Sequence, residues 1–481
     1  MQIKARAGAE TLPALSFCSS QRRVRAMIRT AFVAVTTLLL AAAPATAQSQ
    51  QERLDARYDG VLAAGYKALM LCGAIANAER NSGAATRTPD SVHQWELTGI
   101  DPALDPIIRD LPYEIVRAAD RRVNHVAVQW ADGMAPRYAR HDAGEGCKVL
   151  PIGASAPLTD RWPRDRWEEP FTEMHSARSG PLVDAARAAF TEQYGQGARS
   201  TAVIVTVNGR TSVAEFAEGR RGEPQRTWSV AKSIAATLVG AAVHRGEIAV
   251  KASAGLGVDE ADPRRAITID DALRMATGRY SDTPGNRTDP LYWGGATVDE
   301  VALDWPLIHQ PGAVFRYANN DTLAAVQAIK GTFKSHPPAA FFAQLGMNRT
   351  VAETDWQGNY VLSSQVWATA EDLARFGQLY LDDGVLPDGS RILPEGWVRY
   401  VATPSGPQPD GPFGYGAGFW LMNRSEGVPS DTFAAFGNRG QYVVIVPSRQ
   451  VVIVRRGEDP VGSSFDIAAF TRDVLAALPS G

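Results

Sequence analysis

The sequence predicts an α+β fold in which one largely antiparallel sheet is flanked by helices and interrupted by an inserted helical subdomain. Strand-like segments occur near residues 201–217 and return only after residue 415, while the chain between them is mostly helical. A doubly wound parallel sheet would need strands that alternate with helices throughout, and that alternation is absent. With 481 residues and 45% apolar content, the chain is long enough for two or three domains.

The N-terminus predicts export, with residues 1–47 as a secretion signal. Four arginines within residues 22–29 precede an apolar run from Ala31 to Ala43 and a small-residue site that ends at Ala47. The run is too short for a comfortable membrane span. We therefore expect cleavage after Ala47, no stable membrane insertion afterwards, and a periplasmic or secreted protein. Met27 is a candidate start codon.

The rest of the chain is mildly acidic, which bears on its partners. Residues 48–481 hold 43 basic and 51 acidic residues without a basic cluster. This balance argues against nucleic acid as a partner. The seven histidines are scattered, and neither an H-E-x-x-H nor a C-x-x-C pattern is present. We therefore expect no metal and no cofactor, and we interpret His309 as structural.

Residues 48–180 are expected to form an N-terminal extension without visible chemistry. Its pattern predicts a helix over residues 51–76, interrupted near Gly65, and a strand over residues 123–130. Cys72 and Cys147 form an even pair in an oxidising compartment, which predicts a disulfide. Two buried free thiols are the alternative.

Residues 181–481 are expected to form the second domain. The β-branched run at residues 201–207 predicts a strand, and Asn208-Gly209 predicts a tight turn to a partner strand at residues 212–217. Further strands and helices are expected in this order: a helix over 182–193 before the hairpin, helices within 267–330, Asp321 as the cap of a helix that follows it, a helix over 370–381, strands at 415–421, 432–436, 442–446 and 451–455, and a closing helix over 465–478.

The candidate nucleophile is Ser229, in a helix expected over residues 227–244. Lys232 lies one turn further along on the same side of that helix. A serine hydroxyl is a weak nucleophile until a base takes its proton, and a lysine with a lowered pKa can do so. Unpaired N–H groups at the helix N-terminus can also bind an oxyanion. The alternative is a serine that caps the helix beside a solvated lysine.

Two later segments carry further candidates. In FRYANND, residues 315–321, Tyr317 can act as a general base near a lysine, and Asn319 can orient its partners or the substrate. In AAFGNRGQY, residues 434–442, strand N–H groups can complete an oxyanion hole. The alternatives are a packed tyrosine and glycines that only turn the chain. The candidates for this oxyanion or substrate strand are Ala434, Ala435, Phe436 and Gly440. Tryptophans that either line a pocket or belong to the core are Trp293, Trp305, Trp356 and Trp420.

Together these motifs resemble those of the serine β-lactamase and penicillin-binding-protein superfamily. SVAK, YAN and GNRGQYVVIVP occur in its order, and SSQVWATAEDLARFGQLYLDDG and RILPEGWV are similar to its class C-related branch, which includes 6-aminohexanoate-dimer hydrolases and family VIII esterases. The resemblance covers roughly residues 180–481. It implies a β-lactamase/transpeptidase-like fold, a nucleophile at Ser229 activated by Lys232, and a general base or proton relay at Tyr317 supported by Asn319.

One departure from this pattern bears on the substrate. β-Lactamases and transpeptidases of this type carry Lys-Thr-Gly on the strand beside the site, but residues 432–436 contain no lysine. Such a lysine helps to hold the carboxylate of a β-lactam or peptide. We therefore expect an exported serine hydrolase that cleaves a small ester or amide, including a linear amide, through an acyl-enzyme. The alternatives are a β-lactamase or D,D-peptidase and a non-catalytic ligand-binding module. The oligomeric state and the physiological substrate stay open.

Overall fold

The structure is a computed structural model in which residues Asp59–Gly481 form one compact unit and the residues before Asp59 form another. Its backbone is described for residues 22–79, 87–99, 101–157, 176–280 and 288–478, and its side chains from Ser49 onward. Residues 1–21 of the predicted signal lie outside the described residues. The rest of the signal lies on a helix whose side chains are described only after the expected cleavage site. Signal cleavage and the start at Met27 stay predictions.

Helices of the described chain cover both faces of the main sheet and form the inserted subdomain. In chain order they are α1 (Arg22–Glu79), α2 (Pro89–Trp95), α3 (Asp105–Ile108), α4 (Pro181–Ala188), α5 (Val230–His244), α6 (Ile269–Leu273), α7 (Val298–Val301), α8 (Asn319–Ala328), α9 (Pro338–Gln344), α10 (Ala370–Leu381), α11 (Trp397–Ala402) and α12 (Ile467–Ala476). A short π-helical turn, η3 (Pro290–Gly294), lies before α7.

Strands of the described chain form three sheets. In chain order they are β1 (Tyr113–Arg117), β2 (Val123–Val128), β3 (Arg137–Asp142), β4 (Gly146–Val149), β5 (Ser200–Val207), β6 (Arg210–Phe216), β7 (Gln225–Arg226), β8 (Val351–Ala352), β9 (Val366–Ala368), β10 (Gly414–Tyr415), β11 (Trp420–Leu421), β12 (Phe433–Gly437), β13 (Gln441–Val446) and β14 (Val451–Gly457). The small sheet β7-β9-β8 lies next to the start of α5.

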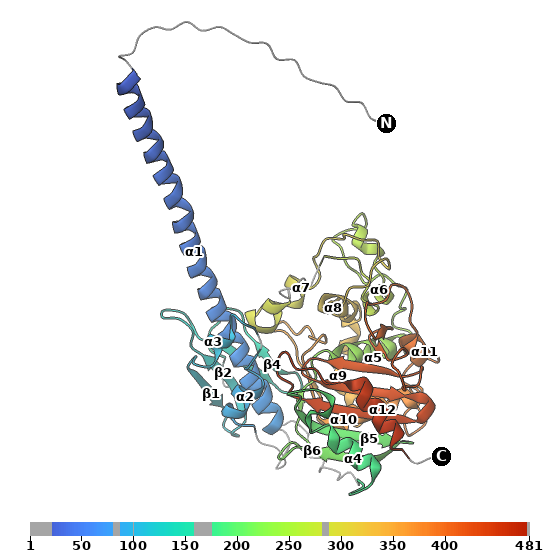
Figure 1. The fold of residues 1–481 in the computed structure, drawn as a ribbon. Coiled ribbons are helices and arrows are strands. Elements are labelled where there is room, and N and C mark those ends of the chain that lie inside the picture. The colour runs from blue at the N-terminus through green and yellow to red at the C-terminus, as the bar shows by residue number, and fades with distance from the viewer. Residues whose placement is uncertain (1–21, 80–86, 100, 158–175, 281–287, 479–481) are drawn as a thin grey trace, which may run out of the picture. The chain divides into compact units, whose positions relative to one another are not determined.

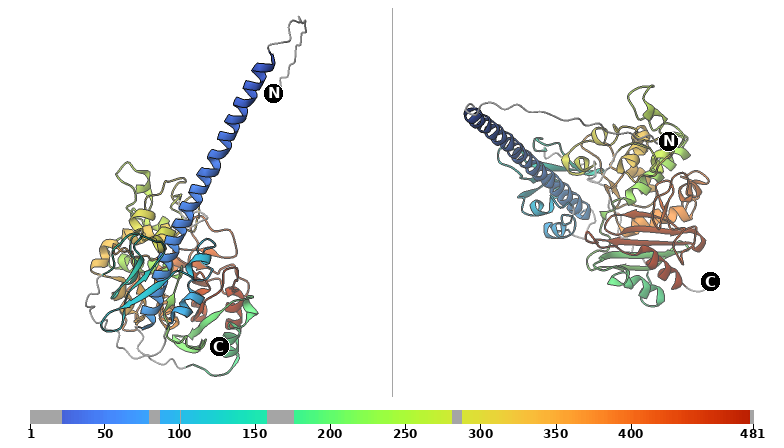
Figure 2. Two further views of the ribbon diagram at one scale, coloured as in Figure 1. Left: turned by 90° about the vertical axis from the view of Figure 1, so that its left-hand side faces the viewer. Right: turned by 45° about the horizontal axis from the view of Figure 1, so that its top comes forward.

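The main sheet has seven strands in the order β10-β11-β12-β13-β14-β5-β6, and every neighbouring pair is antiparallel. It joins an early hairpin to late strands, which Figure 1 shows as green β5 and β6 beside the red C-terminal strands. Two further views follow the same layering (Figure 2). The predicted fold, a sheet built from both ends of this region, is confirmed.

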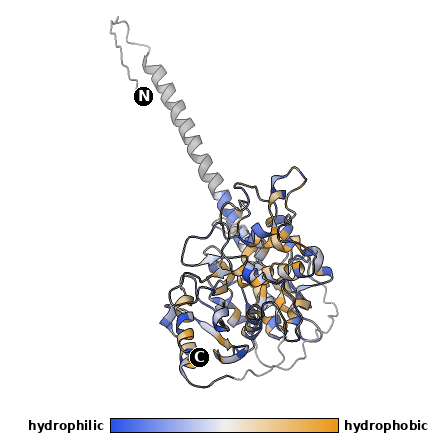
Figure 3. Ribbon diagram, turned by 90° about the vertical axis from the view of Figure 1, so that its right-hand side faces the viewer, coloured by the Kyte–Doolittle hydropathy of each residue, from blue (hydrophilic) through white to orange (hydrophobic). Residues whose placement is uncertain are grey.

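Alternating side chains of the main sheet supply two separate cores. On β5, Ile204 packs in the core beneath α5 and α10, whereas Val203 and Val205 pack in the core beneath α4 and α12. This alternation is the period of two that a strand requires. Figure 3 shows apolar residues gathered where helices and sheet meet.

Two turns of the main sheet show where local sequence decided the geometry. Asn208 and Gly209 join β5 to β6 with φ angles of 48° and 74°, the positive values that a type I′ hairpin needs. The single strand predicted at residues 415–421 is wrong. The chain folds back there as the hairpin β10–β11, because Gly418 adopts a φ of 79° and Gly416 N donates to Phe419 O.

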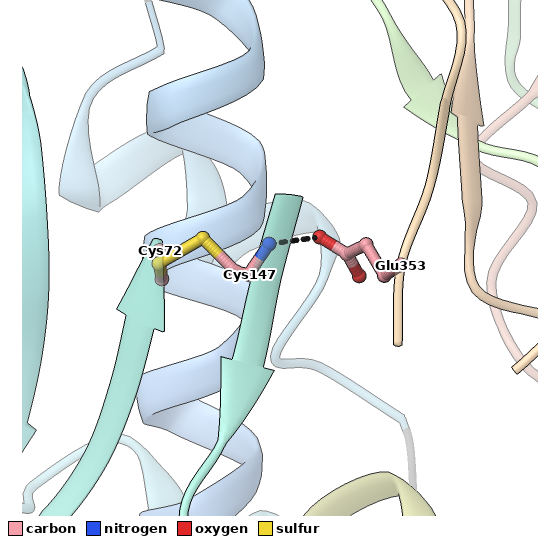
Figure 4. The surroundings of a disulfide bond; sticks show 3 residues. All are labelled: Cys72, Cys147 and Glu353. Atoms are coloured by element: carbon pink, nitrogen blue, oxygen red, sulfur yellow. Dashed lines mark hydrogen bonds between the residues drawn. A yellow bond between two sulfur atoms is a disulfide. The ribbon is translucent and has the colours of Figure 1, made fainter. Parts of the chain in front are cut away.

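The extension has its own four-stranded antiparallel sheet, β1-β2-β3-β4, against the buried part of α1. The predicted interruption of the helix near Gly65 is wrong, since α1 continues to Glu79. Gly65 serves packing instead, because a Cβ there would overlap the carbonyl oxygen of Trp293. Cys72 on α1 and Cys147 on β4 are joined by a disulfide, and Glu353 accepts a 3.0 Å hydrogen bond from Cys147 N (Figure 4).

The segment Ser49–Glu79 of α1 is the helix of the described chain that is long and apolar enough to cross a membrane. The apolar window that meets this criterion is entirely buried inside the protein. A core helix of a globular protein can meet the same criterion, and residues 61–78 of this segment are buried as in such a helix.

Candidate active site

Ser229 lies at the N-terminus of α5, directly after β7 and a sharp bend of the chain. Trp228 has a φ of 50°, a left-handed conformation that costs a non-glycine residue about 1 kcal/mol and turns the chain into the helix. Among the described residues, the Ser229 side chain makes no capping hydrogen bond to its own helix. Its Oγ instead accepts a 3.0 Å hydrogen bond from Lys232 Nζ. This geometry removes the alternative in which Ser229 is only a cap.

Lys232 is buried beneath Ser229, with 1% of its surface exposed. Its Nζ donates to Ser229 Oγ, to Asn319 Oδ1 at 2.5 Å and to the Ser363 carbonyl oxygen at 2.9 Å. These acceptors are neutral: Ser229 lies one turn away on the same helix, and Asn319 and Ser363 come from distant parts of the chain. They hold the nitrogen at the serine, so the solvated lysine of the alternative interpretation is also wrong.

Tyr317 and Asn319 reach the same lysine from the start of α8. The Tyr317 ring centroid lies 5.0 Å from Lys232 Nζ. Asn319 is the first residue of α8, and its Nδ2 donates to Thr288 Oγ1 at 3.1 Å while its oxygen accepts from Lys232. Thr288 thus sets which end of the amide faces the lysine. The four side chains that the sequence singled out as catalytic candidates meet in one place.

The sequence predicted that Asp321 caps the helix that follows it. This prediction is wrong, because α8 begins two residues earlier, at Asn319. The carboxylate is buried, accepts from Thr277 Oγ1 at 2.7 Å and pairs with Arg279 at 3.2 Å. Burial raises the pKa of Asp321, while Arg279 lowers it. Asp321 ties α8 to the segment before it and thereby supports the loop that carries Tyr317.

The strand beside Ser229 is β12, and the residue that meets the nucleophile is Gly437. A Cβ at Gly437 would overlap the Thr227 carbonyl oxygen and lie 3.2 Å from Ser229 N. Pairing between β11 and β12 is confined to Phe433 and Ala434, so it ends before Gly437. At Gly437, the edge of β12 that faces away from β13 is therefore not paired with β11, and it lies beside the backbone N–H of Ser229. An oxyanion needs hydrogen-bond donors at this place.

The strand residues proposed from the sequence occupy other positions. Ala434 and Ala435 are 0% exposed and pack in the cores on opposite faces of the sheet. Gly440 lies against the Arg455–Asp459 ion pair, which leaves no room for a side chain. We therefore replace Gly440 by Gly437 as the glycine at the site. In the sequence, Gly437 could have been recognised as the glycine at the site because it ends a strand just before a turn.

Aromatic rings line the neighbouring edge of the sheet. The Tyr317 ring lies 5.4 Å from that of Trp420, which stacks on Phe436 at 5.8 Å and 16°. Tyr415 contacts both Tyr317 and Trp420. Phe436 immediately precedes Gly437, so this aromatic row connects Tyr317 to the strand beside the nucleophile.

The comparisons with known proteins show the family of the chain. The family model described as Beta-lactamase matches residues 183–475, which is more than half of the chain. The chain belongs to the Beta-lactamase family. Penicillin-binding protein 4 of Amycolatopsis lactamdurans is 26% identical over 373 residues, which cover 65% of this chain and 89% of that relative.

Solved structures similar to this Beta-lactamase-family chain include two hydrolases. A putative 6-aminohexanoate-dimer hydrolase from Bacillus anthracis has 21% identity and a TM-score of 0.49, covering 58% of this chain and 81% of that one. A D-stereospecific amidohydrolase from Streptomyces sp. has 16% identity and a TM-score of 0.46, covering 62% and 97%.

Some contributors to the site in this family member were not predicted from the sequence. Ser363 supplies a backbone oxygen, which no side-chain pattern reveals, and Thr288 belongs to no motif. Of the four tryptophans considered, Trp420 lies at the site, Trp293 is buried, Trp356 is 37% exposed, and Trp305 donates to the Val301 carbonyl oxygen. His309 N donates to Gly278 O at 3.0 Å.

Across the described residues, no group of three or more His, Cys, Asp or Glu side chains is arranged to hold a metal ion.

Proposed function

We propose that this protein is an exported serine hydrolase that cleaves a small uncharged ester or amide through an acyl-enzyme on Ser229. The observation that carries the proposal is the 3.0 Å contact between Ser229 Oγ and the buried Nζ of Lys232. A base at hydrogen-bond distance is what a serine needs to become a nucleophile.

In the proposed reaction, Lys232 first loses one proton, and as the neutral amine it accepts the hydrogen bond from Ser229 Oγ–H instead of donating it. Ser229 Oγ then attacks the carbonyl carbon while its proton moves to Lys232 Nζ. The oxyanion that forms would face Ser229 N–H and the unpaired edge of β12 at Gly437. Collapse of this intermediate breaks the ester or amide bond, and the leaving group takes a proton by way of Lys232 and Tyr317. Water then attacks the acyl-enzyme and, after proton transfer back to Ser229, the acid is released.

The strand beside the site supports an uncharged substrate. Relatives of this type carry a lysine that holds a carboxylate, whereas β12 has no charged residue: Ala434 and Ala435 are buried and Phe436 is partly exposed. The partly exposed rings of Phe436 and Trp420 form an apolar surface there. An apolar or aromatic acyl or leaving group would bury surface against these rings without leaving a charge unpaired.

Export is supported by the signal pattern and by the disulfide between Cys72 and Cys147. The mildly acidic mature chain supports a small-molecule partner rather than nucleic acid.

A β-lactamase or D,D-peptidase is the second candidate. The named penicillin-binding protein, of which this chain covers 89%, favours it. A non-catalytic binding module is the least supported, because it would not need Ser229, Lys232 and Tyr317 around one point.

A panel of p-nitrophenyl esters, short amides and nitrocefin, assayed on the wild type and Ser229→Ala, tests these candidates. We expect ester or amide turnover and fluorophosphonate labelling that both disappear in Ser229→Ala. The matched control is Ser233→Ala, which removes a buried hydroxyl one turn further along α5 that donates to Gly418 O. Turnover by Ser229→Ala would overturn the proposal, and rapid nitrocefin hydrolysis without ester turnover would favour the second candidate.

A further inference from the structure

The N-terminal extension, which lies outside the family match, reaches the segments that carry the candidate catalytic residues. Tyr66 of α1 is 0% exposed, and its OH accepts a 3.3 Å hydrogen bond from Arg226 Nη1 while donating to the Glu96 carbonyl oxygen at 3.3 Å. Arg226 belongs to β7, three residues before the nucleophile. Tyr66 of the extension thus holds the side chain of Arg226, which lies two residues before the bend at Trp228.

Arg226 contacts the backbone segments on both sides of the Ser229–Lys232 pair. Its guanidinium lies 3.8 Å from the ring centroid of Trp228, the left-handed residue that precedes Ser229. Its Nη2 and Nε donate to the Ser364 hydroxyl and carbonyl oxygens at 3.2 and 3.4 Å. Ser364 follows Ser363, whose carbonyl oxygen accepts from Lys232. The buried side chain of Arg226 therefore links the bend before Ser229 to the segment whose carbonyl oxygen accepts from Lys232.

A second chain of contacts runs from α1 through η3 to Ser363. The backbone of η3 packs against Gly65, and the Trp293 ring meets Tyr66 edge-to-face at 5.1 Å. Within η3, the Tyr292 OH lies 2.9 Å from Ser363 Oγ. Ser363 is thus braced through Ser364 and Arg226 on one side and through Tyr292 on the other, and both routes begin on neighbouring residues of α1.

The physical requirement for this bracing follows from the bend itself. A left-handed tryptophan stores about 1 kcal/mol of strain and persists only where its surroundings hold it. A guanidinium is planar and presents its donors in a fixed fork, so it fixes the relative position of its partners in a way that a flexible ammonium does not. Reactions between oriented groups lose up to about 100-fold in rate for a displacement near 1 Å.

We infer that the N-terminal extension is part of the catalytic unit, and that Arg226, held by Tyr66, is a positioning residue for Ser229 and Lys232. The inference rests on the proposed acyl transfer at Ser229. It assigns the extension a role in the reaction rate rather than in delivery or localisation.

The test compares Arg226→Lys with a matched control, Arg137→Lys. Arg137 is buried like Arg226, with 0% and 4% of their surfaces exposed, and it donates to the carbonyl oxygens of Val61 and Leu150 within the extension. We measure kcat and KM on the best ester of the panel, the rate constant of fluorophosphonate labelling, and Tm. For Arg226→Lys we expect kcat and the labelling rate to fall between about tenfold and about 100-fold with KM within about twofold. Arg137→Lys should lower Tm comparably and keep both rates.

A milder variant keeps the test decisive if Arg226→Lys does not fold. Tyr66→Phe removes one hydroxyl, and loss of its hydrogen bond to Arg226 should lower kcat roughly two- to tenfold. Unchanged kcat and labelling rates in Arg226→Lys or, if that variant does not fold, in Tyr66→Phe would overturn the inference. Turnover by Ser229→Ala would instead overturn the proposed function, so the two failures are distinguishable.

Discussion

The extension and the family-matched region differ in how they complete their cores. Both cores of the main sheet are built from residues within the family-matched region. The core of the extension instead includes buried side chains from that region, among them Leu291, Trp293 and Trp367. The two cores of the main sheet thus need no side chain of the extension, whereas the core of the extension is completed by side chains of the matched region. The difference teaches that the extension is an addition in sequence but not a separate folding unit.

Charges at the boundary point the same way. Arg87 of the extension is buried and pairs at 2.5 Å with Glu96 of the extension and at 2.5 Å with Glu223 of the matched region. Arg220 joins Glu458 to the same cluster at 2.9 Å. Arg87 and Glu223 are thus both buried at the boundary, and each has the other as a partner only while the two regions are packed together. The predictions that follow test this dependence, from the largest expected effect to the smallest.

Removing the disulfide should have the largest effect on stability. Cys72 and Cys147 are 75 residues apart, so their bond restricts the unfolded chain and its loss costs about 4 kcal/mol of unfolding free energy. We expect Cys72→Ala/Cys147→Ala to shift the urea unfolding of the whole protein in one transition, insensitive to dithiothreitol. A separate early transition that leaves activity intact would show that the extension unfolds alone.

The contact between α1 and η3 can be tested with two glycines of one helix. Gly65→Ala places a methyl group on the Trp293 carbonyl oxygen and should cost about 3 kcal/mol of unfolding free energy. Gly60→Ala meets nothing within 4 Å, and the better helix propensity of alanine should stabilise the protein by up to about 1 kcal/mol. Urea denaturation of both variants measures the difference. Equal shifts would contradict the packing described for Gly65.

Glu353 of the matched region, which accepts from Cys147 N, should make stability depend on pH. Burial raises its pKa from 4.5 to about 7. Between pH 5 and 7 the unfolded chain releases this proton while the folded protein keeps it, so stability falls as pH rises, by about 2 kcal/mol for this group. Comparing urea denaturation of the wild type and Glu353→Gln at pH 5 and at pH 7 isolates the contribution of Glu353 to the unfolding free energy. A wild-type slope that persists in Glu353→Gln would assign it to other groups.

An exposed ion pair inside the extension should have the smallest effect. Arg117 and Glu79 lie 2.8 Å apart, with side chains 41% and 30% exposed. Solvent screening limits such a pair to less than about 1 kcal/mol. Arg117→Gln should therefore leave the midpoint of urea unfolding almost unchanged, and a loss near that of Gly65→Ala would show that the extension is held by its surface rather than by its shared core.

Short-range features of this protein were determined by the sequence itself. Asn208 and Gly209 predict the hairpin because they tolerate positive φ angles, and the three-residue spacing of Ser229 and Lys232 places both on one side of a helix. The arrangement of strands at the two ends of one region predicted the antiparallel sheet. These features depend on neighbours along the chain, which a sequence displays directly.

Only the tertiary structure decided which distant atoms complete the site. The Ser363 carbonyl oxygen accepts from Lys232 and Gly437 lies at Ser229 N because of strand register and helix packing, and a backbone group carries no signature of either. Gly65 looked like a helix break, and its true role depends on η3, more than 200 residues further along the chain. Contacts of this kind arise from the way buried surfaces fit together, and that fit is a property of the folded chain.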